Sequence, residues 1–159
     1  MTVANPAPRV SELQAADAPA LMALLRAASE EYLRYTPRIR DDLAAFVQQL
    51  QNRQADRWWG LYQDAELVGY FMLRGFDEGY TRPSFGVFIS EAAAGRGLAK
   101  RALAHALEWC GAHQIGAVML KVHHGNARAR QVYARAGFQP QGVCPESGQQ
   151  LMEKLLIRP

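Results

Sequence analysis

The hydrophobic pattern in the first third of the chain predicts two helices. Apolar residues recur there every three to four positions, which is the spacing of one buried helix face. Asp17 precedes the first stretch as an N-cap, and Pro19 lies in its first turn. We predict that this helix runs to about Leu33 and stops before Pro37, and that a second helix begins at about Asp41. The two apolar faces consist of Leu21, Leu24, Leu25 and Ala28, and of Leu43, Phe46, Val47 and Leu50.

Shorter apolar runs, rich in β-branched and aromatic residues and bounded by turn residues, predict strands. They occupy residues 9–13, 58–62, 67–73, 82–90 and 117–122, with a last pair that starts at Phe138 and ends over residues 151–157. The second and third strands form a hairpin through residues 63–66. Two more helices are predicted. The long one begins at Leu98 and ends near residues 111–116, and the short one covers residues 126–136 and is closed by Gly137.

The order of these elements is strand, two helices, three strands, helix, strand, helix and two strands. This mixture predicts an α/β (α+β) layer fold, with a mixed sheet and helices on its faces. A dinucleotide-binding fold is disfavoured, because the GxGxxG fingerprint is absent and three strands precede the glycine-rich turn without crossover helices. The chain contains no internal repeats. We expect one domain over residues 1–159, in which residues 1–8 form a loose N-terminal tail.

The turn between the fourth strand and the long helix is the first candidate for chemistry. Its sequence is Ala94-Gly95-Arg96-Gly97-Leu98-Ala99. A strand that leads through small residues into a helix presents unpaired backbone N–H groups at the positive end of the helix dipole. Such a place binds phosphate, and small residues let an anion approach the backbone closely. Ordinary strand-to-helix turns also contain small residues, so this motif alone leaves both interpretations open.

Composition and charge narrow the class of protein. The chain is 49% hydrophobic and 21% charged, which is typical of a globular domain. It has neither an apolar run long enough to span a membrane nor a secretory signal, so we expect a cytoplasmic protein without membrane contact. Cys110 and Cys144 form no CxxC pair or disulfide framework, and we expect no metal. The net charge of +3 suits an anionic cofactor, but the basic residues are too scattered for a nucleic-acid patch.

A second motif follows the fifth predicted strand and consists of Asn126, Ala129, Tyr133, Gly137 and Phe138. With this spacing the chain resembles the GNAT family of acyl-CoA-dependent N-acyltransferases over residues 9–157. The pyrophosphate motif of that family is (Gln/Arg)-x-x-Gly-x-(Gly/Ala). Gly97 and Ala99 match it, whereas Ala94 stands where Gln or Arg is usual. This departure removes one side-chain contact to the cofactor and leaves the backbone donors in place.

The resemblance implies a GNAT fold, in which a mixed twisted sheet of six or seven strands is flanked by about four helices. It also implies acetyl-CoA as cofactor, with its pyrophosphate on the glycine-rich turn and its pantetheine arm on the edge of the fourth strand, splayed from the fifth. Arg96 and Lys100 either add positive charge there or form a solvated basic helix face. The implied cofactor-binding residues are Phe88, Ile89, Ala94, Gly95, Arg96, Gly97, Leu98, Ala99, Lys100, Asn126 and Tyr133.

Tyr133 is the residue that we expect to act as general acid. A free tyrosine titrates at about pH 10, so its phenol is protonated at neutral pH and can donate to the departing CoA thiolate. The alternative is an aromatic side chain that packs on a helix face. Asn126 is expected to cap the short helix and to touch the cofactor, and Gly137 to close the helix in a left-handed conformation.

The base that removes the proton from the amine must come from outside the fourth strand, which contains no Asp or Glu. We assign this role to Glu78 in the polar loop before that strand, where Asp77 lies beside it. The other candidates are Glu30, Glu31, His123 and His124, each of which is also explained as a solvated surface group. A relay of waters is the remaining alternative.

We therefore expect acetyl transfer from acetyl-CoA to a primary amine of a small molecule, by direct attack in a ternary complex, in a monomer or homodimer. The loop at residues 72–80 is similar to one in GNAT proteins linked to cell-surface sugar biosynthesis, which favours an amino sugar. A protein N-terminal or lysine acetyltransferase is an alternative, although the ribosomal-protein relatives carry Glu where this chain has Lys121. A non-catalytic acyl-CoA sensor is a further alternative, and the presence of Tyr133 favours turnover. Neither cysteine is placed for a covalent intermediate.

Overall fold

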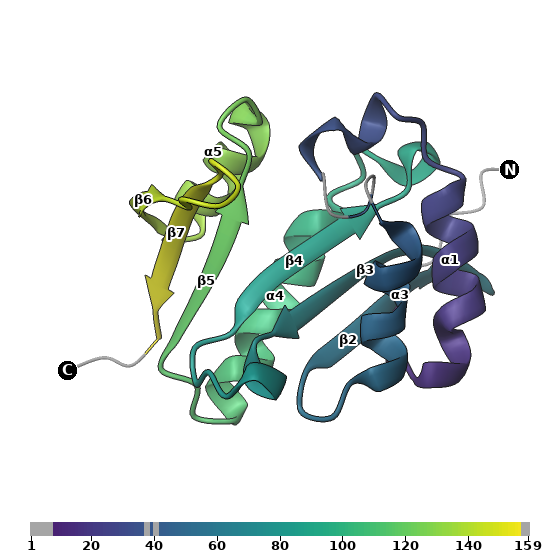
Figure 1. Ribbon diagram of the computed structural model, residues 1–159, viewed down its shortest axis with the longest axis horizontal. Helices are drawn as coiled ribbons and strands as arrows, with labels where there is room; N and C mark the ends of the chain where they lie inside the picture. Colours follow the sequence, from purple (N-terminus) through teal and green to yellow (C-terminus); the bar gives the residue numbers. More distant parts are fainter. Residues whose placement is uncertain (1–7, 37–38, 40–41, 157–159) are drawn as a thin grey trace, which may run out of the picture.

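A computed structural model describes residues 8–36, 39 and 42–156 of the chain. The strands form one seven-stranded sheet in the order β1-β2-β3-β4-β5-β7-β6 (Figure 1). They are β1 (Arg9–Glu12), β2 (Arg57–Gln63), β3 (Glu66–Arg74), β4 (Ser84–Ile89), β5 (Ala117–Val122), β6 (Gln139–Val143) and β7 (Gln150–Leu155). Neighbouring strands run antiparallel except β4 and β5, which run parallel. This mixed sheet confirms the predicted fold class.

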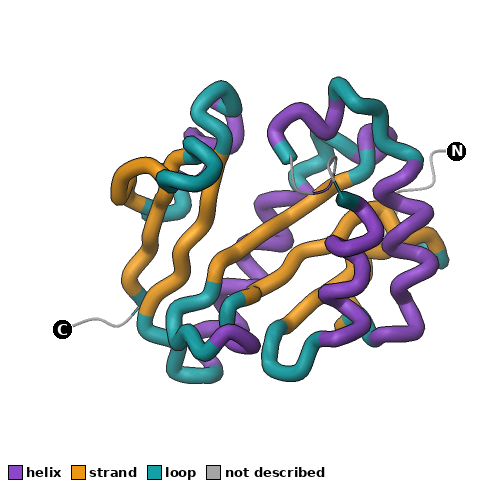
Figure 2. Tube along the Cα trace, in the orientation of Figure 1, coloured by secondary structure: helices purple, strands orange, loops and turns teal. Residues whose placement is uncertain are grey.

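Helices cover both faces of the sheet (Figure 2). The described α-helices are α1 (Ala18–Arg26), α3 (Leu43–Asn52), α4 (Leu98–Ala112) and α5 (Ala127–Arg135). On one face, α1 and α3 pack their apolar side chains against Trp58, Tyr70 and Phe88. On the other face, α4 packs against Trp59 and Phe71. Successive residues of a strand point to opposite faces, so β2 and β3 are apolar on both sides. None of the described helices has the length and apolar character of a membrane span.

The first helix is shorter than the hydrophobic pattern predicts, because α1 already ends at Arg26. A competing set of hydrogen bonds forms at Ser29, just beyond this end. The backbone N–H and the hydroxyl of Ser29 both donate to Oε1 of Glu91, at 2.9 and 2.8 Å. This contact ties the chain to the segment before α4, and the 3-10 turn Tyr32–Tyr35 follows as a separate element. The predicted continuous helix to residue 33 is therefore wrong.

The other elements of the first half agree with the sequence pattern. The β2–β3 hairpin turns at Asp64, whose φ of 54° is left-handed. Helix α3 begins at Leu43, and the carboxylate of Asp42 caps it by accepting from the N–H of Ala45 at 3.0 Å. The start predicted at about Asp41 lies outside the described residues.

Strands β4 and β5 share a short paired stretch and then part. Ser84 pairs with Met119 and Phe85 with Leu120, whereas β4 remains paired with β3 along its length. Beyond Phe85 the two strands diverge toward their carboxyl ends (Figure 1). This splay, which the family resemblance implies, leaves one edge of β4 unpaired and places the first turn of α5 opposite it.

Candidate functional site

The glycine-rich turn before α4 lines a cavity of about 410 Å³, which we call the turn cavity. Gly95 and Gly97 have left-handed backbone conformations, with φ of 80° and 77°. Apart from the adjacent residues, no heavy atom of the described chain lies within 4 Å of the position that a Cβ would take at either glycine. Because glycine adopts a left-handed φ without strain, the sequence can expose this backbone to a ligand.

Helix α4 begins at this turn with unused hydrogen-bond donors. The N–H of Arg101 donates to the carbonyl of Gly97 at 3.2 Å and closes the first turn of the helix. The preceding N–H groups, of Leu98, Ala99 and Lys100, therefore have no acceptor within the helix. They lie at the positive end of the helix dipole, next to the ammonium of Lys100. This open, electropositive backbone fits a pyrophosphate.

The structure brings most of the predicted cofactor residues together around the turn cavity. Those that line it are Ile89, Ala94, Gly95, Gly97, Leu98, Ala99, Lys100, Asn126 and Tyr133. Arg96 and Phe88 are not among its described lining. The guanidinium of Arg96 donates to Oε1 of Gln63 at 2.7 Å. Phe88 is buried on the opposite face of the sheet, where its ring stacks on that of Tyr70 with 6.0 Å between centroids.

Sequence reasoning missed several residues of the turn cavity, among them Tyr32, Arg128 and Val132. Arg128 and Val132 lie one position before Ala129 and Tyr133 on α5, so the same helix face carries all four. The helical period alone could have identified this pair. Tyr32 could not be found in this way, because its role depends on a tertiary contact. Its hydroxyl donates to the carbonyl of Ile89 at 2.5 Å, at the end of β4 where that strand no longer pairs with β5.

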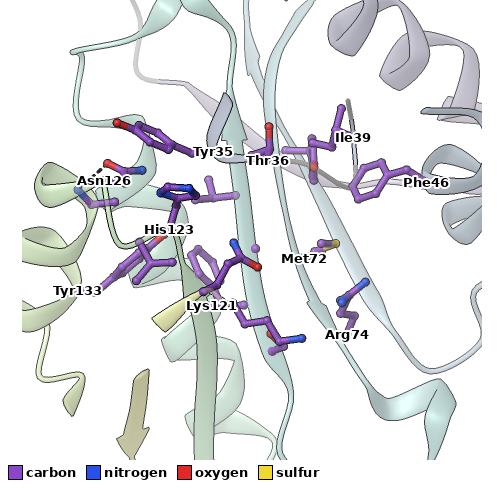
Figure 3. Close-up of a pocket in the computed structure, with 18 residues that line it drawn as sticks. Tyr35, Thr36, Ile39, Phe46, Met72, Arg74, Lys121, His123, Asn126 and Tyr133 are labelled. Atoms are coloured by element: carbon purple, nitrogen blue, oxygen red, sulfur yellow. Dashed lines mark hydrogen bonds between the residues drawn. The ribbon is translucent and has the colours of Figure 1, made fainter. Parts of the chain in front are cut away.

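A second cavity, of about 190 Å³, opens on the face of the sheet that α1 and α3 cover, and we call it the sheet cavity (Figure 3). Aromatic and apolar side chains such as Phe46 and Met72 form part of its wall, and Arg74 and Lys121 form another part. Tyr133 lines both the sheet cavity and the turn cavity. Tyr133 therefore lies where the two cavities adjoin, together with Val87, Asn126 and Ala129.

The side chain of Tyr133 packs against aromatic neighbours. Its ring meets Phe85 and Phe138 edge to face, with centroids 6.5 and 6.0 Å away. No described residue forms a hydrogen bond with its hydroxyl, which is left available to a ligand. Burial raises the pKa of Tyr133 to about 12, because desolvation disfavours the phenolate. At neutral pH the group is a proton donor.

Comparison with known protein families decides which proteins this chain is related to. The model of the GNAT acetyltransferase family matches residues 20–138, which include the glycine-rich turn, Asn126 and Tyr133. The chain belongs to the GNAT acetyltransferase family. It is an acetyl-CoA-dependent N-acetyltransferase, as the two sequence motifs predict. Among curated protein sequences, none matches this GNAT chain significantly.

Solved structures of GNAT proteins share the fold. The PaiA N-acetyltransferase of Thermoplasma acidophilum, in complex with coenzyme A, is 19% identical over 95% of this chain and 100% of its own, with a TM-score of 0.73. The GNAT domain of S. lividans PAT is 18% identical over 94% and 90%, with a TM-score of 0.80. A ribosomal-protein-alanine N-acetyltransferase of Brucella melitensis is 21% identical over 93% and 99%, with a TM-score of 0.75.

Two further motif residues of this GNAT protein have the predicted local roles. The side chain of Asn126 accepts from the N–H of Ala129 at 3.2 Å and so caps α5, while it also lines both cavities. Gly137 has a φ of 99° and ends α5, and the N–H of Phe138 returns to the carbonyl of Tyr133 at 3.0 Å. Both ends of α5 are thus fixed by the sequence around Tyr133.

The acidic candidates for the base lie away from Tyr133. Glu78 lines an adjoining cavity that shares Arg74, Ser84 and Lys121 with the sheet cavity, but it is not in the described lining of the sheet cavity itself. Asp77 has a structural role, since its carboxylate accepts from backbone N–H groups of residues 54 and 55 at 3.0 and 2.5 Å. The described lining of the sheet cavity contains no carboxylate.

His123 lines the sheet cavity, but its hydrogen bonding argues against a role as base. Its Nδ1 accepts from the N–H of Gly125 at 3.0 Å, so the neutral ring carries its proton on Nε2. The ring cannot take up another proton while that bond stands. It also packs against the rings of Tyr35 and His124, with centroids 4.9 and 4.5 Å away. His123 therefore forms part of the wall of the sheet cavity.

Proposed function

We propose that this GNAT protein transfers an acetyl group from acetyl-CoA to the primary amine of a small molecule, by direct attack in a ternary complex. The position of Tyr133 carries the proposal. A proton donor at the junction of two cavities suits a reaction in which one substrate enters from each side. The turn cavity would take acetyl-CoA and the sheet cavity the acceptor amine.

On the cofactor side, the N–H groups of residues 97–100 would bind the pyrophosphate, and the unpaired edge of β4 near Ile89 would align the pantetheine arm. Acetyl-CoA supplies an activated thioester. Lys100 would add a charge contact, while Arg96 would act through its backbone, because its side chain is bonded to Gln63. The backbone donors would replace the side-chain contact that Ala94 cannot make.

On the chemical side, Tyr133 would act as general acid. A nitrogen–carbon bond forms to the acetyl group, the carbon–sulfur bond breaks, and its electron pair stays on sulfur. The Tyr133 phenol gives its proton to that sulfur, so that coenzyme A leaves as a thiol and not as a thiolate. The neutral amine that attacks loses one proton after the new bond forms, and a proton returns to the Tyr133 phenolate, so the phenol is restored. We infer that the amine proton leaves through water, since Glu78 lies outside the described lining and His123 Nδ1 is occupied.

The proposal also specifies the class of acceptor, a small molecule and not a protein. Solved relatives include a ribosomal-protein-alanine N-acetyltransferase, so a protein N-terminus is the rival acceptor. Lys121 favours the small molecule, because it stands where the ribosomal-protein relatives carry Glu and adds a cation to the sheet cavity.

Release of free thiol from acetyl-CoA tests the proposal directly, with small amines and with short peptides as separate panels. We expect turnover with small amines. Turnover confined to peptides would replace the small-molecule acceptor by a protein N-terminus or lysine. Binding of acetyl-CoA without turnover on either panel would contradict catalysis and favour a sensor.

The Tyr133→Phe variant tests the mechanism, because it removes one oxygen and keeps the ring against Phe85 and Phe138. Only the proton given in the transition state is lost, so kcat should fall by about 10²–10⁴. The dissociation constant of acetyl-CoA should change little. The loss should be smaller with an acyl donor whose thiol is more acidic. Wild-type kcat under conditions where chemistry limits the rate would make Tyr133 a packing residue.

A further inference from the structure

Arg74 and Lys121 bring two positive charges to the sheet cavity. Arg74 ends β3 and faces Ser84 on β4, and Ser84 faces Met119 on β5, two residues before Lys121. Because side chains two residues apart on a strand share a face, both cations lie on the face where the sheet cavity opens. Figure 3 shows them together at the end of the cavity away from Tyr35.

Neither charge is neutralised within the part of the chain that the structure describes. Other arginines of this protein form ion pairs, but Arg74 and Lys121 form none with a described residue. The described lining of the sheet cavity holds no Asp or Glu. Glu78 and Glu146 line the adjoining cavity, and neither is ion-paired with the two cations. Arg74 also lines a surface pocket with Asp56, Asp77 and Glu78, but none of these carboxylates is ion-paired with it. The half-buried guanidinium and the more exposed ammonium therefore line the sheet cavity without an ion pair to a described residue.

These cations are not placed to serve the phosphates of the cofactor. The glycine-rich turn, with its own donors and Lys100, lies in the turn cavity, and neither Arg74 nor Lys121 is in the described lining of that cavity. Their positive charge therefore lies in the sheet cavity and not in the turn cavity. A site that concentrates one sign of charge attracts the opposite sign and repels its own.

We propose that the acceptor amine carries an anionic group, a carboxylate or a phosphate monoester, which Arg74 and Lys121 bind while the amine faces Tyr133. This inference rests on the proposed function and names its substrate class. The planar guanidinium offers two parallel N–H donors to either anion, and the lysine adds a point charge. Amino acids and phosphorylated amino sugars fit this description. Polyamines do not, because their ionisable groups are all cationic and none is anionic.

Matched pairs of acceptors test this inference, with free-thiol release as the readout. The members of each pair differ by one anionic group: an amino acid against its amide, and glucosamine against glucosamine 6-phosphate. Rates are compared per concentration of free amine, because amidation also lowers the pKa of the α-amine of an amino acid. We expect kcat/KM to favour the anionic member by about 10- to 100-fold, the range of a hydrogen bond to a charged group. The preference should shrink as salt is added. The two pairs also separate a carboxylate from a phosphate as the preferred anion.

Variants then assign the effect to the two side chains. Arg74→Gln and Lys121→Gln should each raise KM for the anionic acceptor about tenfold or more and leave the neutral partner nearly unchanged. Arg74→Lys and Lys121→Arg should restore part of the preference. Arg101→Gln is the matched control, since Arg101 is exposed on α4 outside both cavities and its loss removes the same charge. It should keep the full preference.

Three outcomes would overturn the inference. Equal kcat/KM within each pair would show that the anion is not recognised, while the thiol release itself would leave the proposed function standing. An equal loss for anionic and neutral acceptors in Arg74→Gln would make Arg74 structural. Absence of thiol release from every anionic acceptor, with turnover of small amines that carry no anion, would refute the inference and leave the proposed function standing.

Discussion

At the scale of single residues, the phenol of Tyr133 and the ring of His123 show how the surroundings select one chemical role. Burial raises the pKa of Tyr133 to about 12, which keeps the proton on the group that we propose as general acid. The N–H of Gly125 occupies Nδ1 of His123 and removes that ring from the candidates for a base. Residue type suggested both roles, and only the local contacts separate them.

The raised pKa of Tyr133 predicts the alkaline side of the pH–rate profile. An ordinary tyrosine loses its proton at about pH 10, whereas this phenol should remain a donor until about pH 12. We therefore expect kcat to stay level between about pH 9 and 10.5 once the acceptor amine is deprotonated. The raised pKa of Tyr133 also makes the free energy of unfolding depend on pH, and stability falls as pH rises. The contribution of the neutral phenol is fully present below about pH 10 and is lost as pH rises toward 12, so rates are best measured below that window.

The profile of Tyr133→Phe provides the control for that measurement. Both proteins should lack a kinetic pKa near 10, and they should differ in the height of the plateau. A limb near pH 10 that is present in the wild type and absent in Tyr133→Phe would mean that the phenol titrates normally. The proposed desolvation of Tyr133 would then be wrong.

At the scale of elements, the contact between Ser29 and Glu91 decides where the first helix ends. Hydrogen bonds from the N–H and the hydroxyl of Ser29 hold the pKa of Glu91 below its ordinary value. We expect Ser29→Ala, which removes the hydroxyl bond, to raise the pKa of Glu91 toward the ordinary value. The contribution of this carboxylate to folding is present above about pH 4.5 and is lost as pH falls through its lowered pKa. Titration of Glu91 by NMR in both proteins measures the shift. An unchanged titration curve would leave the backbone N–H as the effective partner.

The glycine-rich turn gives the second prediction at this scale. Gly97→Glu places a carboxylate beside the donors at the start of α4, so acetyl-CoA binding should be lost by calorimetry. Gly79→Glu is the matched control, because Gly79 also has a left-handed φ, 91°, with no described atom near its Cβ position, and lies outside the turn cavity. It bears the same strain and charge. Undiminished affinity for acetyl-CoA in a folded Gly97→Glu protein would show that the glycine-rich turn does not bind the pyrophosphate.

Elements that rest on local patterns were predicted from the sequence, and contacts between distant segments were not. The bounds of β5, the cap at Asn126 and the left-handed Gly137 follow from neighbouring residues. The Ser29–Glu91 contact joins positions 62 residues apart, and no periodicity encodes it. The same holds for Arg74 and Lys121. They meet on one face only because of the pairing register of β3, β4 and β5.

At the scale of the whole molecule, two apolar cores lie on opposite faces of one sheet, and the site occupies the place where that sheet opens. The half formed by β5, β7 and β6 joins the rest through the short pairing of β4 with β5 and through ring contacts such as Phe85 with Tyr133. A ligand in the turn cavity touches β4, α4 and α5 at once. Its binding should therefore stabilise the entire fold.

Thermal unfolding with and without coenzyme A measures this coupling. A ligand at 100 times its dissociation constant stabilises the folded state by about 2.7 kcal/mol. For a chain of this size that corresponds to a rise in Tm of about 5–11 °C. Tyr133→Phe should show the same rise, because it removes a transition-state contact and keeps the cofactor contacts. Gly97→Glu should show no rise in Tm, because its carboxylate blocks the glycine-rich turn. Gly79→Glu should show the same rise as the wild type. A rise of equal size in Gly97→Glu would place the coenzyme elsewhere on the protein, and the assignment of the turn cavity would fall with it.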